Sequence, residues 1–179
     1  MHRFLAEARC LLATIAFDNV LEVGCGPGDL AHALFASKSQ PKPEYRGIDI
    51  GQTQVDIARS RYSDLVFNVA SAYKLPATDG STNLVVACEV LEHLDRPDEA
   101  LKEMHRVSNS ALLVSVPWEP MWRILNMARG KYLRSFGNTP GHVQHFSRNA
   151  IVRLVSQHFV VTHVKSPLPW TMLLAHKRN

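Results

Sequence analysis

A glycine-rich turn carries the strongest chemical signal in the sequence. The apolar run Val20–Val23 is followed by Gly24-Cys25-Gly26-Pro27-Gly28 and then by a helix-like segment. Glycines allow a tight turn and the close approach of a ligand to the backbone, and the start of a helix adds unpaired N–H groups. The dinucleotide fingerprint G-x-G-x-x-G would place its third glycine at position 29, which is Asp29. The turn therefore indicates a ligand site that departs from the dinucleotide pattern.

Two acidic residues accompany this turn. Glu22 lies in the preceding strand, two residues before Gly24, and a carboxylate there suits a cationic ligand better than a pyrophosphate. S-adenosylmethionine, which carries a sulfonium and an ammonium group and no phosphate, is such a ligand. Asp49 ends the next expected strand, where an acid usually accepts hydrogen bonds from ribose hydroxyls. That position suits NAD as well as S-adenosylmethionine, and an aspartate that caps the next helix is the alternative interpretation.

His142 and His145 are candidate general bases. They lie in the segment Gly141-His-Val-Gln-His-Phe-Ser147. A general base takes a proton from a hydroxyl or an ammonium group that is to react, and histidine has an unperturbed pKa of about 6.5. His145 is the better candidate of the two, and a structural role at the end of a long insert is the alternative.

The elements that must position these residues alternate between short apolar runs and helix-like segments. Apolar runs predict strands at 20–23, 45–50, 65–70, 83–88 and 111–116, and helical spacing predicts helices at 29–37, 52–61, 97–107 and 151–157. This alternation predicts a parallel sheet covered on both faces. Two further expected strands, Phe159–Val164 and Trp170–His176, are separated by Lys165–Pro169 alone. So short a connection predicts an antiparallel pair, because a parallel crossover needs a dozen or more residues.

Residues 117–146 fit none of these elements. The segment contains several prolines and glycines, four basic residues and several aromatic residues. Long excursions of this kind inside a compact domain are usually functional or disordered. We therefore expect one domain over residues 1–179 with a lid-like insert at about 117–146, which closes over an apolar or anionic acceptor. Peripheral contact with a membrane and a structural helix with a solvated basic face are the alternatives.

Composition sets the broad class. The 179 residues include 20 Lys+Arg and 16 Asp+Glu, an excess too small to indicate nucleic-acid binding. No stretch approaches the roughly 18 apolar residues of a membrane span. The three cysteines, Cys10, Cys25 and Cys88, form no C-x-x-C pair, so they predict neither a zinc site nor a disulfide framework. Reduced thiols of this kind are typical of a cytoplasmic protein, and no metal site is expected.

Four motifs in order resemble the class I S-adenosylmethionine-dependent methyltransferases. They are Glu22-Val-Gly-Cys-Gly-Pro-Gly28, Gly47-Ile-Asp49, Leu75-Pro-x-x-Asp79-Gly-Ser81 and Val90-Leu-Glu-His-Leu94. The group that includes the ubiquinone and menaquinone biosynthesis methyltransferases is the most similar. The resemblance covers residues 18–116 well and the region after Phe146 weakly. It implies a Rossmann-like three-layer α/β sandwich, with a mostly parallel seven-stranded sheet that ends in an antiparallel pair.

The resemblance also implies which residues contact the cofactor S-adenosylmethionine. By this resemblance, Glu22 faces the ammonium group of the methionine part. Asp49 takes the ribose, and Ile50 lies against the adenine. The implied contacts in full are Glu22, Gly24, Cys25, Gly26, Asp49, Ile50, Ser71, Ala72, Cys88 and Glu89.

Two of these positions merit comment. Members of the family often have an aspartate after the third strand, which accepts a hydrogen bond from the adenine amino group, and the matching residue here is Ser71. A serine can still form a hydrogen bond, but without charge. Glu89 follows the fourth expected strand, beside the methyl-transfer site that the resemblance implies. Glu89 is therefore a further candidate for catalysis.

The sequence thus predicts an S-adenosylmethionine-dependent methyltransferase that acts on a small-molecule acceptor. A methyltransferase for RNA or protein is one alternative, although the modest net charge and the lack of an appended binding domain weigh against it. A protein that binds the cofactor without catalysis is another alternative. The glycine pattern weighs against a dehydrogenase.

Overall fold

The computed structural model describes residues 1–36, 42–118, 127 and 143–178. The elements, in chain order, are α1 (His2–Leu12), β1 (Asn19–Val23), α2 (Asp29–Phe35), β2 (Glu44–Asp49), α3 (Gln52–Arg61), β3 (Val66–Val69), β4 (Thr82–Cys88), the 3-10 helix η1 (Leu91–His93), α4 (Pro97–Val107), β5 (Ser108–Pro117), α6 (Arg148–Val155), β6 (Phe159–Lys165) and β7 (Trp170–Lys177).

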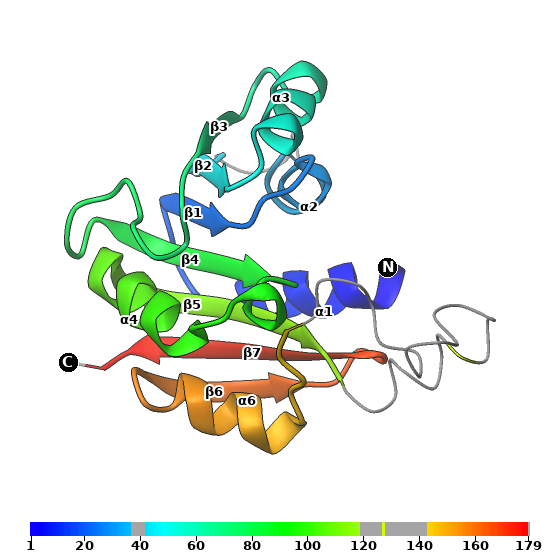
Figure 1. The fold of residues 1–179 in the computed structure, drawn as a ribbon, viewed down its shortest axis with the longest axis vertical. Coiled ribbons are helices and arrows are strands. Elements are labelled where there is room, and N and C mark those ends of the chain that lie inside the picture. The colour runs from blue at the N-terminus through cyan, green and yellow to red at the C-terminus, as the bar shows by residue number, and fades with distance from the viewer. Residues whose placement is uncertain (37–41, 119–126, 128–142, 179) are drawn as a thin grey trace.

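The strands form a seven-stranded sheet in the order β3-β2-β1-β4-β5-β7-β6 (Figure 1). The five strands from β3 to β5 pair in parallel. β7 runs antiparallel to both of its neighbours, β5 and β6. The predicted mostly parallel sheet with an antiparallel C-terminal pair is therefore confirmed.

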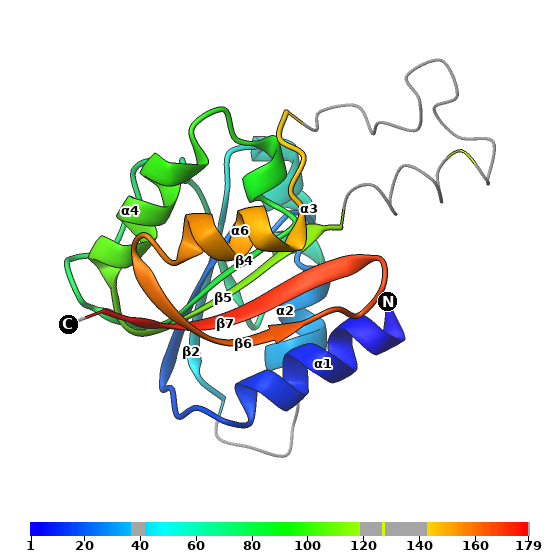
Figure 2. The same ribbon diagram turned by 90° about the horizontal axis from the view of Figure 1, so that it is seen from below.

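Helices cover both faces of the sheet, which makes three layers. α4 and α6 lie on one face, and α1 and α2 lie on the other (Figure 2). The sequence of α4 shows why such a helix packs on a sheet: Ala100, Leu101, Met104 and Val107 recur at helical spacing and are all fully buried. Val55 and Ala58 of α3 are buried in the same apolar cluster as residues of α1 and α2.

The order of strands reverses at β1. The chain goes outward from β1 to β2 and β3, and then returns to place β4 on the other side of β1. In open α/β sheets, ligands bind beyond the carboxyl ends of the strands at such a switch point. The glycine turn after β1 and Glu89 after β4 both lie there.

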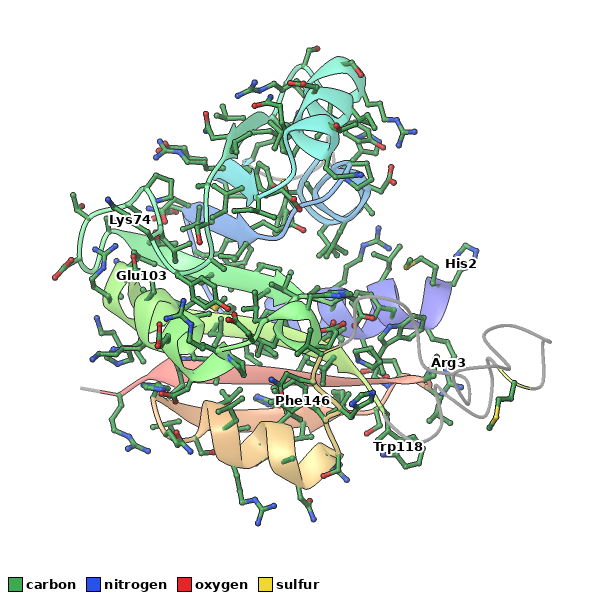
Figure 3. The ribbon with its side chains drawn as sticks, viewed as in Figure 1. His2, Arg3, Lys74, Glu103, Trp118 and Phe146 are labelled. Carbon is green, nitrogen blue, oxygen red and sulfur yellow. The ribbon has the colours of Figure 1, made fainter. Side chains whose placement is uncertain are left out.

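The two ends of the expected insert are attached at this edge. The Trp118 backbone N–H donates to the Pro169 carbonyl (2.8 Å), and the Val143 N–H donates to the Glu92 carbonyl (2.8 Å). Figure 3 shows Trp118 beyond the end of β5 and Phe146 close to the start of α6. Most of residues 117–146, His142 included, lies outside the described residues, so the lid-like insert and the single-domain boundary stay predictions.

Two further findings concern the described residues. No helix among them is both long and apolar enough to cross a membrane.

α6 begins three residues earlier than its apolar periodicity predicts, at Arg148 rather than Ile151. The Ser147 hydroxyl accepts a hydrogen bond from the Ala150 N–H (3.2 Å). This side-chain cap stabilises the start of the helix, and the spacing of apolar residues carries no information about it.

Candidate functional site

The turn after β1 needs glycines for its backbone. Gly24, Gly26 and Gly28 have φ values of 70°, 51° and 83°, a left-handed region that glycine enters at little cost. The Cys25 N–H donates to the Ile48 carbonyl of β2 (2.9 Å), and the Gly28 N–H donates to the Cys25 carbonyl (3.1 Å). These bonds fix the turn at the carboxyl end of the sheet, directly before α2.

The surroundings of the three glycines differ. A Cβ atom on Gly24 would lie 2.4 Å from Val90 Cγ2, and one on Gly28 would lie 2.9 Å from Tyr62 Cδ2. A Cβ atom on Gly26 would meet nothing within 4 Å. Packing therefore excludes a side chain at Gly24 and Gly28, whereas Gly26 borders open space, as expected where a ligand approaches the backbone.

Asp49 connects the glycine turn to the start of α3. One carboxylate oxygen accepts a hydrogen bond from the Gly26 N–H (2.9 Å), and the other accepts from the Gly51 N–H (2.8 Å). Asp49 therefore holds the Gly51 backbone just ahead of α3, although α3 itself begins without a side-chain cap. A carboxylate oxygen has two lone pairs, so each oxygen can still accept from a ribose hydroxyl, and the two roles are compatible.

A cavity of about 460 Å³ lies over the ends of β1, β2 and β4 and is called here the Asp49 cavity. Its lining includes four of the residues predicted to hold the adenosine part: Asp49, Ile50, Ser71 and Ala72. Ile50 is 75% exposed, which is unusual for an isoleucine and leaves an apolar surface for a flat ring. The Ser71 hydroxyl accepts from the Tyr73 N–H (3.2 Å), and its O–H group and a second lone pair remain for a ligand.

Glu22 is buried, with 2% of its surface exposed. The Tyr45 hydroxyl donates to its carboxylate (2.6 Å). Burial raises the pKa of Glu22 to about 7, although the bond from Tyr45 lowers it in part. Gly47 makes this contact possible, because it pairs with Glu22 in the sheet and a Cβ atom there would lie 2.5 Å from the Tyr45 hydroxyl oxygen.

A second cavity, of about 400 Å³, lies on the other side of the glycine turn and is called here the Phe4 cavity. Phe4 and Leu5 of α1 contribute to its wall, together with Glu22, Cys88 and Glu89. Gly24, Gly26 and Glu89 line both cavities, so the two adjoin along the turn.

The two cysteines of the site remain thiols. Burial, together with the nearby Glu22 and Asp49 carboxylates, raises the pKa of the Cys25 thiol to about 12. Burial also raises the pKa of the Cys88 thiol well above its usual range. Because the thiolate is the reactive form, Cys25 and Cys88 serve here as small apolar groups.

Glu89 has an unusual backbone and fixed partners. Its φ of 59° is left-handed, which is uncommon for a residue with a side chain. One carboxylate oxygen accepts from the Ser115 hydroxyl (3.2 Å), and the other accepts from the indole N–H of Trp170 (2.9 Å). Burial raises the pKa of Glu89 to about 7, and both hydrogen bonds oppose this rise.

The structure brings together every residue predicted to contact the cofactor, since each lines at least one of the two cavities. These placements leave the individual contacts as predictions. His145 is exposed and lines neither cavity, and His142 lies outside the described residues. A catalytic role for either histidine also stays a prediction.

Sequence reasoning missed the residues that hold the two buried carboxylates. Tyr45 binds Glu22, and Ser115 and Trp170 bind Glu89. Phe4 of α1, which no sequence motif indicates as a site residue, lines a cavity and contacts Trp170 edge-to-face (ring centroids 5.3 Å apart). One local signal was available for Tyr45: it precedes Gly47 by two residues and so shares its face of β2.

The fold and the site together define a nucleotide-type ligand site at the switch point of a mixed α/β sheet. A family model described as a methyltransferase domain matches residues 21–111, which is about half of the chain. The match includes Gly24, Gly26 and Glu89, the residues that line both cavities. The chain therefore belongs to this family of methyltransferase domains, and the predicted class I S-adenosylmethionine-dependent type and its cofactor are confirmed.

Known proteins agree with this assignment. An uncharacterized methyltransferase of Schizosaccharomyces pombe is 35% identical over 66% of the chain and 50% of its own length. A demethylmenaquinone methyltransferase of Chlorobaculum parvum is 31% identical over 49% of the chain and 35% of its own length. The chain thus spans half or less of these relatives. Magnesium protoporphyrin IX methyltransferase of Synechocystis, solved with S-adenosylhomocysteine bound, shares the fold (TM-score 0.73, 16% identity, 99% of this chain and 84% of that one).

Proposed function

We propose that the protein transfers a methyl group from S-adenosylmethionine to a small-molecule acceptor. The observation that carries the proposal is the pair of cavities that adjoin at Gly24, Gly26 and Glu89. A cofactor with two unlike halves and a reactive centre between them fits such a pair. The acidic lining at Glu22 suits the positive charge of that cofactor.

The Asp49 cavity matches the adenosine half of the cofactor, and the side of the Phe4 cavity formed by the glycine turn matches the methionine half, which leaves the side formed by α1 and Trp170 for an acceptor. Asp49, Ile50, Ser71 and Ala72 would hold the adenosine half, since they offer acceptors and an apolar surface in one cavity. Gly24, Cys25 and Gly26 would border the methionine half, with Glu22 near its ammonium group. Each of these roles follows from the family resemblance and from the position of the residue in the cavities.

S-adenosylmethionine supplies a methyl group already activated for displacement. The chain's task is then to position the acceptor and to exclude water. The Phe4 cavity is largely apolar, and Glu89 at its border can accept a proton near neutral pH because its pKa is raised to about 7. Glu89 is therefore a stronger candidate base than the exposed His145.

The volume of the Phe4 cavity, about 400 Å³, lies within the roughly 300–1,000 Å³ of small-molecule sites. The apolar or anionic acceptor expected from residues 117–146, and the alternative of peripheral membrane contact, concern a segment that lies mostly outside the described residues. The cytoplasmic location stays a prediction that rests on the reduced cysteines. RNA or protein as acceptor becomes an outcome of the test below.

Two measurements test the proposal. Calorimetry with S-adenosylmethionine, S-adenosylhomocysteine and NAD should show binding of the first two and none of NAD. Purified protein incubated with S-adenosylmethionine and a small-molecule extract should then form S-adenosylhomocysteine. Binding without turnover against small molecules, RNA or protein would indicate a non-catalytic protein, and tight NAD binding alone would overturn the assignment.

A further inference from the structure

Glu89 lies where the two cavities meet. It lines both the Phe4 cavity and the Asp49 cavity, and it directly follows the last residue of β4, Cys88. In the proposed function, this border is where the methyl group passes from cofactor to acceptor. A charged group at the border therefore bears on which acceptors can bind.

The carboxylate of Glu89 is held by donors from two other strands. Trp170 begins β7, and its indole N–H can donate but never accept. Ser115 lies in β5 and donates to the other oxygen. Donors on both oxygens favour the charged carboxylate over the acid and fix its orientation. Lone pairs remain on both oxygens for a further donor.

The remaining wall of the Phe4 cavity is apolar and partly aromatic. Of its acidic side chains, Glu22 is assigned to the cofactor ammonium in the proposed function and Asp29 pairs with Arg61 (3.4 Å), which leaves Glu89 for the acceptor. Among the described residues that line it, there is no lysine, arginine or histidine side chain. The apolar and aromatic members of the lining include Phe4, Leu5, Leu30, Ala33 and Trp170. An anionic ligand would meet repulsion here, whereas a cation can interact with both the carboxylate and the aromatic rings.

We propose that the methyl acceptor is a small apolar amine, which places its apolar part in the Phe4 cavity and its nitrogen at the Glu89 carboxylate. This assignment rests on the methyltransferase function proposed above and names its substrate class. Glu89 then acts as both the specificity-determining residue and the proton acceptor.

The chemistry balances without any further reactant. The bound ammonium gives one proton to the Glu89 carboxylate, which frees the nitrogen lone pair. That pair forms the new N–C bond to the methyl carbon, and the S–C bond breaks with its electron pair passing to sulfur. The products are a neutral thioether and an N-methylammonium ion, and the proton on Glu89 is released to water.

Binding of matched probes tests the acceptor class without relying on turnover. Phenethylamine, 2-phenylethanol and 3-phenylpropionate share a phenyl group and differ in charge. Calorimetry on protein saturated with S-adenosylhomocysteine, at about pH 8 where the amine is protonated, should show the amine binding roughly tenfold or more tightly than the other two. With S-adenosylmethionine, mass spectrometry should detect N-methylphenethylamine and no methyl ether or ester.

Variants locate the preference at Glu89. Glu89→Gln should weaken phenethylamine binding by roughly tenfold or more, and 2-phenylethanol binding should stay within about threefold of wild type. Trp170→Phe keeps an aromatic ring and removes the N–H donor, so it should give a smaller loss. Glu44→Gln, on an acid whose side chain is 79% exposed, is the control and should change nothing.

The outcomes separate this inference from the proposed function. Equal or tighter binding of the alcohol or the carboxylate, an unchanged amine affinity in Glu89→Gln, or no amine binding at millimolar concentration would each overturn the amine assignment. In all three cases, binding of S-adenosylhomocysteine by the wild-type protein would leave the methyltransferase proposal standing. Failure of the wild-type protein to bind S-adenosylhomocysteine would instead reject the proposed function itself.

Discussion

Replacing Glu22 by glutamine should abolish the loss of stability that this residue causes as pH rises in the ligand-free protein, and it should weaken cofactor binding. Glu22 is 2% exposed, and burial raises its pKa from 4.5 to about 7. Between these two values the folded state binds more protons than the unfolded state. The contribution of Glu22 to the free energy of unfolding therefore falls as pH rises through this window. Above about pH 7 the folded protein bears the full cost of a buried charge.

The size of this cost follows from the shift. One pKa unit corresponds to about 1.4 kcal/mol, so a shift from 4.5 to about 7 corresponds to about 3 kcal/mol. For a domain of this size, each kcal/mol changes Tm by roughly 2–4 °C. The glutamine amide must find its own hydrogen-bond acceptor, which returns about 1–3 kcal/mol of the gain at every pH. The test is therefore how the difference in stability between variant and wild type changes with pH, and not which of the two is more stable at one pH.

The measurement is the difference in Tm between Glu22→Gln and wild type, without ligand, at a series of pH values from about 5 to about 8. This difference should move in favour of the variant by roughly 5–10 °C across the series. Glu44→Gln, whose carboxylate is exposed, should show no such trend. S-adenosylhomocysteine should bind wild type more tightly as pH rises and should bind the variant weakly throughout. A difference in Tm that stays constant with pH would refute the reasoning.

Three further substitutions separate structural from ligand-binding roles. Gly26→Ala should fold, at some cost in Tm because its φ of 51° is left-handed, and it should lose cofactor affinity because its Cβ atom would project into the space where the ligand approaches. Gly24→Ala should lower Tm by several degrees, because its Cβ atom would lie 2.4 Å from Val90. Calorimetry and thermal melting compare the two alanine variants, and equal changes in affinity and Tm would contradict the different roles of Gly24 and Gly26. Asp49→Asn removes an acceptor from one backbone N–H, so it should reduce Tm and lower the affinity for S-adenosylhomocysteine by roughly tenfold or more; wild-type affinity would show that Asp49 is only a structural cap.

Local patterns in the sequence were sufficient to predict the architecture. The helical spacing of Ala100, Leu101, Met104 and Val107 predicts one buried face, and all four are buried. The short connection after β6 requires an antiparallel pair, which the structure contains. The order of the strands was not predicted, because strand pairing depends on contacts between residues far apart in the chain.

The site was predicted where its residues are close in sequence. The glycine turn and Asp49 each follow a recognisable strand, and both line the cavities. Trp170 lies 81 residues from Glu89, and nothing near either residue in the sequence indicates that contact. The glycine pattern also treats Gly24 and Gly26 alike, although packing requires the first and open space surrounds the second.

The two buried carboxylates share a physical arrangement that favours a cation at this site. Glu22 and Glu89 lie in or directly after neighbouring strands, β1 and β4, and burial raises the pKa of each to about 7. Each also accepts hydrogen bonds that stabilise its charged form, from Tyr45 in one case and from Ser115 and Trp170 in the other. A core position that served packing alone would be more stable with an apolar side chain. At a ligand site, by contrast, a positively charged ligand offsets the cost of burying the carboxylate. Hydrogen-bond donors that stabilise the charged carboxylate are therefore expected there, because its charge is useful in the complex.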